Sequence, residues 1–281
     1  MLAVLHDREP VQAGRAHLQV DCVADASTVT AQYSTSPMKL VVPRARGRSV
    51  WAYTSSFGGG MVAGDQTHLG LRLGPQARCF LGSQAWTKIY RNPGCLPSRH
   101  VTQATLAAGA ILVFAPDPIQ AFAGSRYTQA QQFHLEAEAS LFLLDWFTAG
   151  RVALGERWAF EGYQSRNEAW VDGVRLLDDA LHLSPGDGTL TAPHRLGRFN
   201  CLATLWLIGP AFRTLAEATL QGIHDTAVRR RADLVMNASP VRGGCVLRLA
   251  ATDFEQVAQE LRPRVAGLSD LLADDPWSRK W

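Results

Sequence analysis

A glycine-rich stretch that ends in an acid raises the question of a phosphate-binding loop. Its glycines are Gly58, Gly59, Gly60 and Gly64. Gly59 and Gly64 have the spacing of G-x-x-x-x-G-K-[ST], but Asp65 stands at the lysine position and Gln66 at the hydroxyl position. The carboxylate would repel a phosphate, and the third glycine of the dinucleotide pattern falls on Ala63. We therefore expect the glycines to shape a bend before a strand, through unusual backbone angles or close approach.

Two weaker motifs suggest other chemistry. Ser36 and Lys39 have the S-x-x-K spacing of an acyl-transfer pair, but the S-D-N and K-T-G motifs that accompany such a pair are absent, so chance is the better interpretation. Asp65 and His68 would suit nickel or zinc if they shared a loop, although a solvated histidine is the commoner outcome. The residues alone therefore give no complete catalytic set.

Period-two alternation dominates the first two-thirds of the chain and predicts half-buried strands. It occurs in "HLQVDCVA", "HLGLRLG" and "QFHLEAEASLFLL", the last interpreted as one strand pattern from Phe133 to Leu141. Turn residues separate many such segments at spacings of roughly 8–12 residues. The prediction is a mainly β fold of many short strands in a stacked or sandwich-like architecture, with two helices in the C-terminal third.

The period becomes helical after Gly209 and Pro210. We expect helical segments at about 210–236 and 252–274, after a strand-rich region at 15–208, in a single domain spanning 1–281. Thr252 and Glu255 have the spacing of a capping box, and Pro263 should kink or restart the second helix. The arginines at 229–231 are interpreted as a solvated face of the first helix.

Composition narrows the function classes. A net charge of +3 gives no reason to expect a nucleic-acid partner, and no apolar run is long enough to span a membrane. The first residues lack the apolar core of a signal peptide. We expect a soluble cytoplasmic protein. The five scattered cysteines have no C-x-x-C pair, so most are predicted to be core residues.

Three segments in order resemble the UreD family of urease accessory proteins, called UreH in some bacteria. The first is "GGGMVAGDQTHLGLRLG", with the G-G-x-x-x-G-D signature, and the second is "CFLGSQAWTKIYRN". The third runs from Pro116 to Glu168 and carries D-P-x-x-x-F, D-W-x-x-x-G-R and G-E-x-W-x-F, as in the plant and fungal branch. Many bacterial members have Gln-Glu where this chain has Asp117-Pro118, and Trp-Glu where it has Asp145-Trp146.

The resemblance implies a metallochaperone scaffold that is not an enzyme. Such proteins bind apo-urease and recruit UreF, which docks the GTPase UreG that delivers nickel. The family is thought to pass nickel through an internal channel, so no tightly bound cofactor is expected and nickel would be in transit. A route of this kind needs oxygen and nitrogen ligands weak enough to release the ion.

On this resemblance we predict which residues serve the nickel path and the partners. Path residues are Asp65, Gln84, Thr87, Asp117, Asp145 and Glu156. Charge partners are Lys88, Arg91, Arg151 and Arg157. The helix from Phe212 to Met236 and the tail, with Trp277 and Trp281, combine aromatic residues and arginine, which are enriched at interface hot spots, and are predicted to meet the UreF-like partner.

Two other functions stay open. Asp117 and Asp145 would serve a carboxylate-dependent β-sheet hydrolase if they lay roughly 5–10 Å apart across a cleft. The chain would otherwise be an interaction module that has lost its urease role. A test of urease activation separates both from the scaffold.

Overall fold

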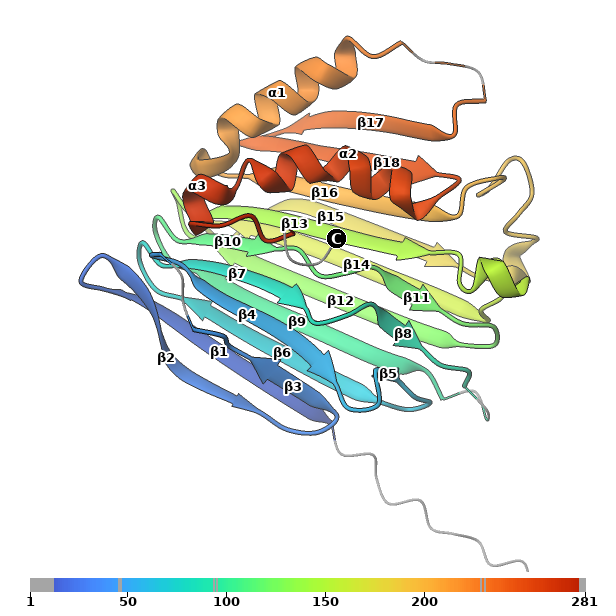
Figure 1. Cartoon of the computed structure of the whole chain (residues 1–281), viewed down its shortest axis with the longest axis horizontal. Helices are drawn as coiled ribbons and strands as arrows, with labels where there is room; N and C mark the ends of the chain where they lie inside the picture. Colours follow the sequence, from blue (N-terminus) through green and yellow to red (C-terminus); the bar gives the residue numbers. More distant parts are fainter. Residues whose placement is uncertain are drawn as a thin grey trace, which may run out of the picture.

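The structure is a computed structural model that describes residues 13–44, 47–92, 94, 96–227, 229 and 231–277. Within them the strands form two sheets, of seven and eleven strands (Figure 1). The first contains, in spatial order, β15 (Val174–Leu183), β14 (Gly162–Val171), β12 (Arg126–Leu135), β9 (Ser98–Leu106), β6 (Gln66–Leu73), β1 (Gly14–Val23) and β2 (Ala26–Ser34). The second contains β17 (Leu234–Val241), β18 (Gly244–Ala251), β16 (Cys201–Ile208), β13 (Ser140–Thr148), β10 (Ile111–Phe114), β7 (Arg78–Ser83), β4 (Val50–Ser56) and β3 (Met38–Val41), with β5 (Gly60–Met61), β8 (Thr87–Ile89) and β11 (Ile119–Ala121) beside them. The predicted stacked, mainly β architecture is confirmed.

The middle of the chain winds as a coil in which successive turns add parallel strands to both sheets. β4, β7, β10 and β13 lie parallel in one sheet, and β6, β9, β12 and β14 lie parallel in the other. Parallel neighbours cannot be joined by a two-residue hairpin, so the chain crosses to the other sheet between them. Residues at equal positions on successive turns therefore lie side by side, in register.

Alternate side chains fill the space between the sheets. Leu69, Leu71 and Leu73 of β6 are almost fully buried and pack in one apolar cluster with Leu141 and Leu143 of β13. The alternation of "HLGLRLG" thus marks the buried face as predicted. Burial of such side chains is the main favourable contribution to this layered fold.

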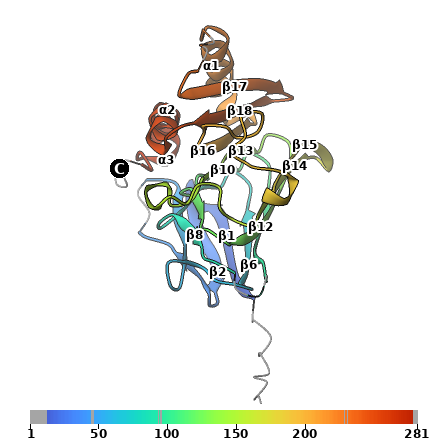
Figure 2. The same ribbon diagram turned by 90° about the vertical axis from the view of Figure 1, so that its right-hand side faces the viewer.

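The helices cover the outer side of the larger sheet, two near its C-terminal edge and the third farther along it, against β7. They are α1 (Arg213–His224), α2 (Phe254–Ala266) and α3 (Ser269–Leu272), with 3-10 turns at η1 (Val152–Leu154), η2 (Pro185–Asp187) and η3 (Pro210–Phe212). α1 lies against β16, β17 and β18, and α2 against β16 and β18 (Figures 1 and 2). Val257, Leu261 and Val265 of α2 are fully buried and form a second apolar core with this sheet.

The first helical segment is shorter than predicted. After η3, α1 ends at His224, and Leu234 to Met236 begin β17, which pairs with β18. The residues from Leu234 to Met236 fit the helical period by chance, but they pair with the neighbouring strand β18. Arg229 and Arg231 are exposed beyond the end of α1, so the prediction that this cluster lies on a helix face is wrong, and Arg230 lies outside the described residues.

Two further boundaries differ from the prediction. The stretch from Phe133 to Leu141 is divided between β12 and β13 by a turn in which Glu138 has a φ of 64°. The second helix begins at Phe254, and its cap is Asp253, whose Oδ1 accepts the Glu255 N–H at 2.9 Å. Asp253 has extended backbone angles suited to a cap. The predicted cap, Thr252, is therefore one residue too early in the chain. The helix passes through Pro263 and ends at Ala266.

The glycine-rich stretch forms the bend that the sequence predicts. Gly58, Gly59 and Gly64 have φ angles of 83°, 71° and 83°, which other residues rarely adopt. Gly60 serves close approach, because a Cβ at this position would lie 2.5 Å from the Lys88 carbonyl oxygen and 2.6 Å from the Tyr90 ring. Both reasons for using glycine therefore occur in one loop.

Gly60→Ala is expected to destabilise the protein by about 1–3 kcal/mol, the usual cost of overpacking. The added methyl would push β5 away from β8, which it pairs through Gly60 and Met61. Thermal unfolding measures the effect. Gly162→Ala is the matched control, because its Cβ would meet no atom within 4 Å. Equal melting temperatures for the two variants would contradict the close-approach explanation.

The structure tests the prediction that most cysteines are core residues. Cys79, Cys201 and Cys245 are fully buried, which confirms them as core residues. Burial raises the pKa of the Cys79 and Cys201 thiols to about 12. Cys22 is partly exposed, and Cys95 lies outside the described residues.

In the described part of the chain, no helix has the length and apolar character needed to cross a membrane.

Candidate functional site

A band of polar side chains crosses the otherwise apolar space between the sheets. Its two rows, each in register across neighbouring strands, are Thr67, His100, Gln129 and Ser165, and Thr102, Gln131 and Asn167. Thr102 is completely buried, and Gln131 and Asn167 are each 3% exposed. Gln131 Nε2 donates to Asn167 Oδ1 at 2.9 Å. Because burying unpaired polar groups is costly, such a band is kept only where its members hydrogen-bond one another.

Asp145 on β13 of the opposite sheet is the centre of this band. Its carboxylate accepts hydrogen bonds from Gln129 Nε2 at 3.1 Å, Ser165 Oγ at 2.9 Å and Asn167 Nδ2 at 2.7 Å. Burial raises the pKa of the Asp145 carboxyl, and the three hydrogen bonds act in the opposite direction. Within the described residues no lysine, arginine or histidine forms an ion pair with Asp145, so its donors are neutral.

His100 lies in the same band with both ring nitrogens close to hydroxyl groups. Nδ1 is 2.8 Å from Thr67 Oγ1, and Nε2 is 3.0 Å from Thr102 Oγ1. Burial lowers the pKa of His100 to about 4, and the nearby charge of His68 contributes in the same direction. His100 is therefore a neutral imidazole at neutral pH.

Two cavities meet the band from different sides. The smaller, of about 120 Å³, is lined by Thr67, His100 and Gln129 and reaches the segments around Gly59 and Thr87. The larger, of about 400 Å³, lies between β14–β15 and β16–β18. Among the described residues, Asp145 alone lines both cavities.

The structure brings three of the predicted path residues to one cavity. Asp117, Asp145 and Thr87 all line the smaller cavity. Asp117 is 5% exposed, and its Oδ2 accepts a hydrogen bond from Ser83 Oγ at 3.1 Å. The Asp117 N–H donates to the same Ser83 oxygen at 2.7 Å. The loop after β10 and the end of β7 thus hold this carboxylate in place.

The other three predicted path residues line neither cavity. Asp65 closes the glycine bend, where its Oδ2 accepts the Val62 N–H at 2.8 Å. Gln84 is exposed beyond β7. Glu156 forms an ion pair with Arg151, whose Nε is 2.9 Å from Glu156 Oε2. These residues lie in a turn and at the surface, away from the band around Asp145, and their role in a nickel path stays a prediction.

The predicted charge partners do not neutralise the interior acids. Arg151 pairs with Glu156 at the surface, as a charge partner should, and its guanidinium lies 4.3 Å from the Phe122 ring centre. Arg157 instead donates to Asn200 Oδ1 and to the carbonyl oxygens of residues 197 and 199. It therefore anchors a loop. Lys88 and Arg91 are exposed and line neither cavity.

Trp277 is in the core, which corrects its prediction as a partner-binding surface residue. It is 2% exposed and stacks on Trp146 with ring centres 5.6 Å apart and planes 9° apart. Trp146 also contacts Phe254 at the start of α2. The tail thus packs its aromatic side chain under the helix. Trp281 lies outside the described residues.

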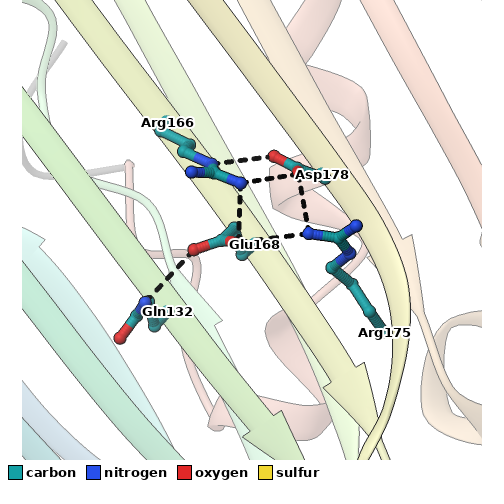
Figure 3. A network of polar contacts seen from close by, with 5 residues as sticks. All are labelled: Gln132, Arg166, Glu168, Arg175 and Asp178. Atoms are coloured by element: carbon teal, nitrogen blue, oxygen red, sulfur yellow. Dashed lines mark hydrogen bonds and ion pairs between the residues drawn. The ribbon is translucent and has the colours of Figure 1, made fainter.

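The outer face of the smaller sheet carries a separate charge network (Figure 3). Arg166 makes a bidentate contact with Asp178, at 3.0 and 2.8 Å, and lies 3.2 Å from Glu168. Arg175 contacts the same two acids, and Gln132 Nε2 donates to Glu168 at 3.1 Å. Glu168 and Asn167 are consecutive in β14 but face opposite sides, as strand geometry requires. These acids are neutralised, whereas Asp145 is not.

Sequence reasoning missed most of the band. The missed members are Thr67, His100, Thr102, Gln129, Gln131, Ser165 and Asn167. A signal for two of them was present, since Gln129 and Gln131 have the same parity as the buried Phe133 and Leu135 in β12. A polar residue at a core position of an alternating strand marks a buried network.

Comparisons with known proteins place the chain among urease accessory proteins. A family model described as UreD urease accessory protein matches residues 12–281. The chain is 44% identical over 275 residues to urease accessory protein UreD of Sorangium cellulosum, covering 98% of this chain and 86% of that protein. It is 39% identical over 269 residues to UreD of an Anaeromyxobacter species, covering 96% and 90%. Urease accessory protein D of Oryza sativa subsp. indica is 28% identical over 288 residues, covering 92% and 94%.

Proposed function

Since the chain belongs to the UreD family of urease accessory proteins, we propose that it is a scaffold for nickel insertion into urease. It holds apo-urease and recruits UreF, which brings the GTPase UreG. The names of its bacterial, plant and fungal relatives support the accessory role. The chain itself makes and breaks no covalent bond.

The observation that carries a nickel path is the position of Asp145 in the walls of both cavities. The three hydrogen bonds from neutral donors favour the charged form of the Asp145 carboxyl against the effect of burial. Low polarity around a carboxylate strengthens its attraction for a passing cation. Asp117 supplies a second carboxylate to the smaller cavity. Hydroxyl and amide groups of the band supply weak oxygen ligands, which suit nickel in transit better than thiolates would.

The proposed route has two ends. One is the smaller cavity, which reaches the glycine bend at Gly59 and the segment at Thr87. The other is the larger cavity beside β15 and β18. Asp65 and Glu156 have no part in this route, because both are engaged outside these two cavities. The path proposed from the structure therefore keeps Asp117, Asp145 and Thr87 and adds the buried band.

The paired-acid hydrolase is less well supported. Asp117 and Asp145 do line one cavity, but its volume of about 120 Å³ is below the roughly 300–1,000 Å³ of typical ligand pockets. The size suits a small ion instead.

Coexpression tests the proposed function. Urease subunits are produced with UreF and UreG, with or without this chain, and the nickel content and activity of the purified urease are measured. We expect both to rise only when the chain is present. Equal maturation without it would contradict the scaffold, and a complex that forms without raising the nickel content of urease would indicate the interaction module. Purified chain that hydrolyses a small substrate would support the enzyme instead.

A further inference from the structure

An ion pair connects the two sheets beside the larger cavity. Asp179 Oδ1 on β15 lies 3.1 Å from the Arg248 NH2 group on β18, and both residues line that cavity. The Asp179 side chain is 28% exposed and that of Arg248 is 49% exposed. This is the only ion pair between the sheets within the described residues.

Asp179 differs from its neighbour Asp178 in the direction it faces. Asp178 points to the outer face, where Arg166 and Arg175 both contact it (Figure 3). Asp179 points to the opposite face and, among the residues that the structure describes, has a single cationic partner, Arg248. The two acids are equally exposed, so they form a matched pair that differs in the side of the sheet.

Polar residues connect the ion pair with Asp145 along both sheets. Asn167 is in register with Asp179 and donates to Asp145 at 2.7 Å. In the other sheet Arg248 is in register with Thr204, and Thr204 with Asp145. Two strand spacings of about 4.8 Å separate the backbones at Arg248 and Asp145. Polar residues in register therefore lie between the partly exposed ion pair and the interior acid on both sheets.

The two charges of the pair have opposite effects on a cation that approaches the cavity. Asp179 attracts it, Arg248 repels it, and the two cancel while they remain paired. Burial is the main cause of the raised pKa of Asp145, and the charge of Asp179 contributes in the same direction. The two acids therefore act on each other electrostatically. A partly exposed ion pair is weakly held, so a divalent cation can compete with the guanidinium for Asp179.

We propose that the Asp179–Arg248 ion pair is a charge-selective gate on the larger cavity. While the pair is closed, the Arg248 side chain spans the gap between the sheets and blocks the way to Asp145. A divalent cation that binds Asp179 releases Arg248 and opens the way toward Asp145. The identification of that cation as nickel rests on the proposed function, whereas the gate itself can be tested on the isolated chain.

The test uses a cysteine reporter at Thr204, which lies in register between Asp145 and Arg248 and lines the larger cavity. Thr204→Cys is made in a chain that carries Cys22→Ser and Cys95→Ser, so that the native thiols left are Cys79, Cys201 and Cys245, which are buried. Cationic, anionic and neutral methanethiosulfonate reagents of similar size are applied, and their rates of modification are compared.

Arg248→Gln is expected to raise the ratio of cationic to anionic rates about fivefold, and Asp179→Asn to lower it about fivefold, as for one charge removed at the edge of a cavity. Both variants should speed the neutral reagent, because each opens the pair. Magnesium chloride, compared with sodium chloride at equal ionic strength, should speed the neutral reagent in the parent chain and have no effect in Asp179→Asn.

Asp178→Asn is the control, and it should change neither the ratio nor the magnesium response. If the pair only ties the sheets together, magnesium should leave the rate of the neutral reagent in the parent chain unchanged, and that result would overturn the gate. Unchanged modification rates in both Arg248→Gln and Asp179→Asn would also overturn the gate. Circular dichroism and thermal melting confirm that each variant is folded. A urease that matures without the chain would refute the proposed function and leave these rates as they are.

Discussion

Trp277→Ala is expected to destabilise the protein by about 3–5 kcal/mol, the range for removing a large aromatic side chain from a core. For a protein of this size the melting temperature should fall by on the order of 10 °C. Trp277 is 2% exposed and stacks on Trp146, which packs on Phe254 of α2. Its removal leaves a cavity where the tail, the helix and the sheet meet.

Differential scanning calorimetry and urea unfolding measure this loss. Trp277→Phe keeps an aromatic ring beside Trp146 and should recover about half of it. Phe57→Ala, which removes an aromatic side chain that is 60% exposed, should change stability little. If Trp277→Ala melted like the parent chain but failed to bind UreF in a pull-down, Trp277 would be an interface residue and its packed position would be wrong.

Local patterns predicted the strands better than the way they pair. The alternation of Leu69, Leu71 and Leu73 is sufficient to identify a half-buried strand. Nothing in that stretch shows that its neighbours are the parallel strands β1 and β9. The coil repeats a backbone path while its residues vary from turn to turn, so the sequence carries no internal repeat that would predict it.

The tail and the helix ends show where tertiary contacts override sequence preference. An aromatic residue near a chain end suits either an interface or a core, and the composition around Trp277 is the same in both cases. Its burial depends on Trp146, which is more than a hundred residues away. In the same way, Leu234 to Met236 fit a helical period, but pairing with β18 makes them a strand.

The candidate site was predictable only in two acids and in Thr87. The resemblance identified Asp117 and Asp145, and the structure places both at one cavity. Asp65 and Glu156 were predicted with them because all four are acids in motifs, but a turn amide and Arg151 engage those two elsewhere. Whether a carboxylate faces a cavity or a turn depends on strand register, which residue type does not encode.

Asp145→Asn is expected to lower the nickel incorporated per urease site about tenfold, which corresponds to about 1.4 kcal/mol of lost attraction for the ion. The same variant should melt no lower than the parent chain at neutral pH. Burial raises the pKa of the folded-state Asp145 carboxyl above its unfolded value, so the folded protein binds this proton more tightly than the unfolded chain does. Stability therefore falls as pH rises through the raised pKa, and asparagine removes that loss.

Asp178→Asn is the matched control and should behave in the opposite way. The hydrogen bond from Arg166 lowers the pKa of the Asp178 carboxyl, so this group stabilises the fold above its unfolded pKa and ceases to do so as pH falls through the lowered value. Its replacement should lower the melting temperature at neutral pH and leave nickel incorporation intact, since Asp178 lies outside both cavities. Nickel content of coexpressed urease and melting curves at pH 5 and pH 7 test both variants. Full nickel incorporation with Asp145→Asn would exclude this carboxylate from the path. A lower melting temperature for Asp145→Asn would make Asp145 a structural residue. The removal of a charge that only lowers the stability of the fold should not lower the melting temperature.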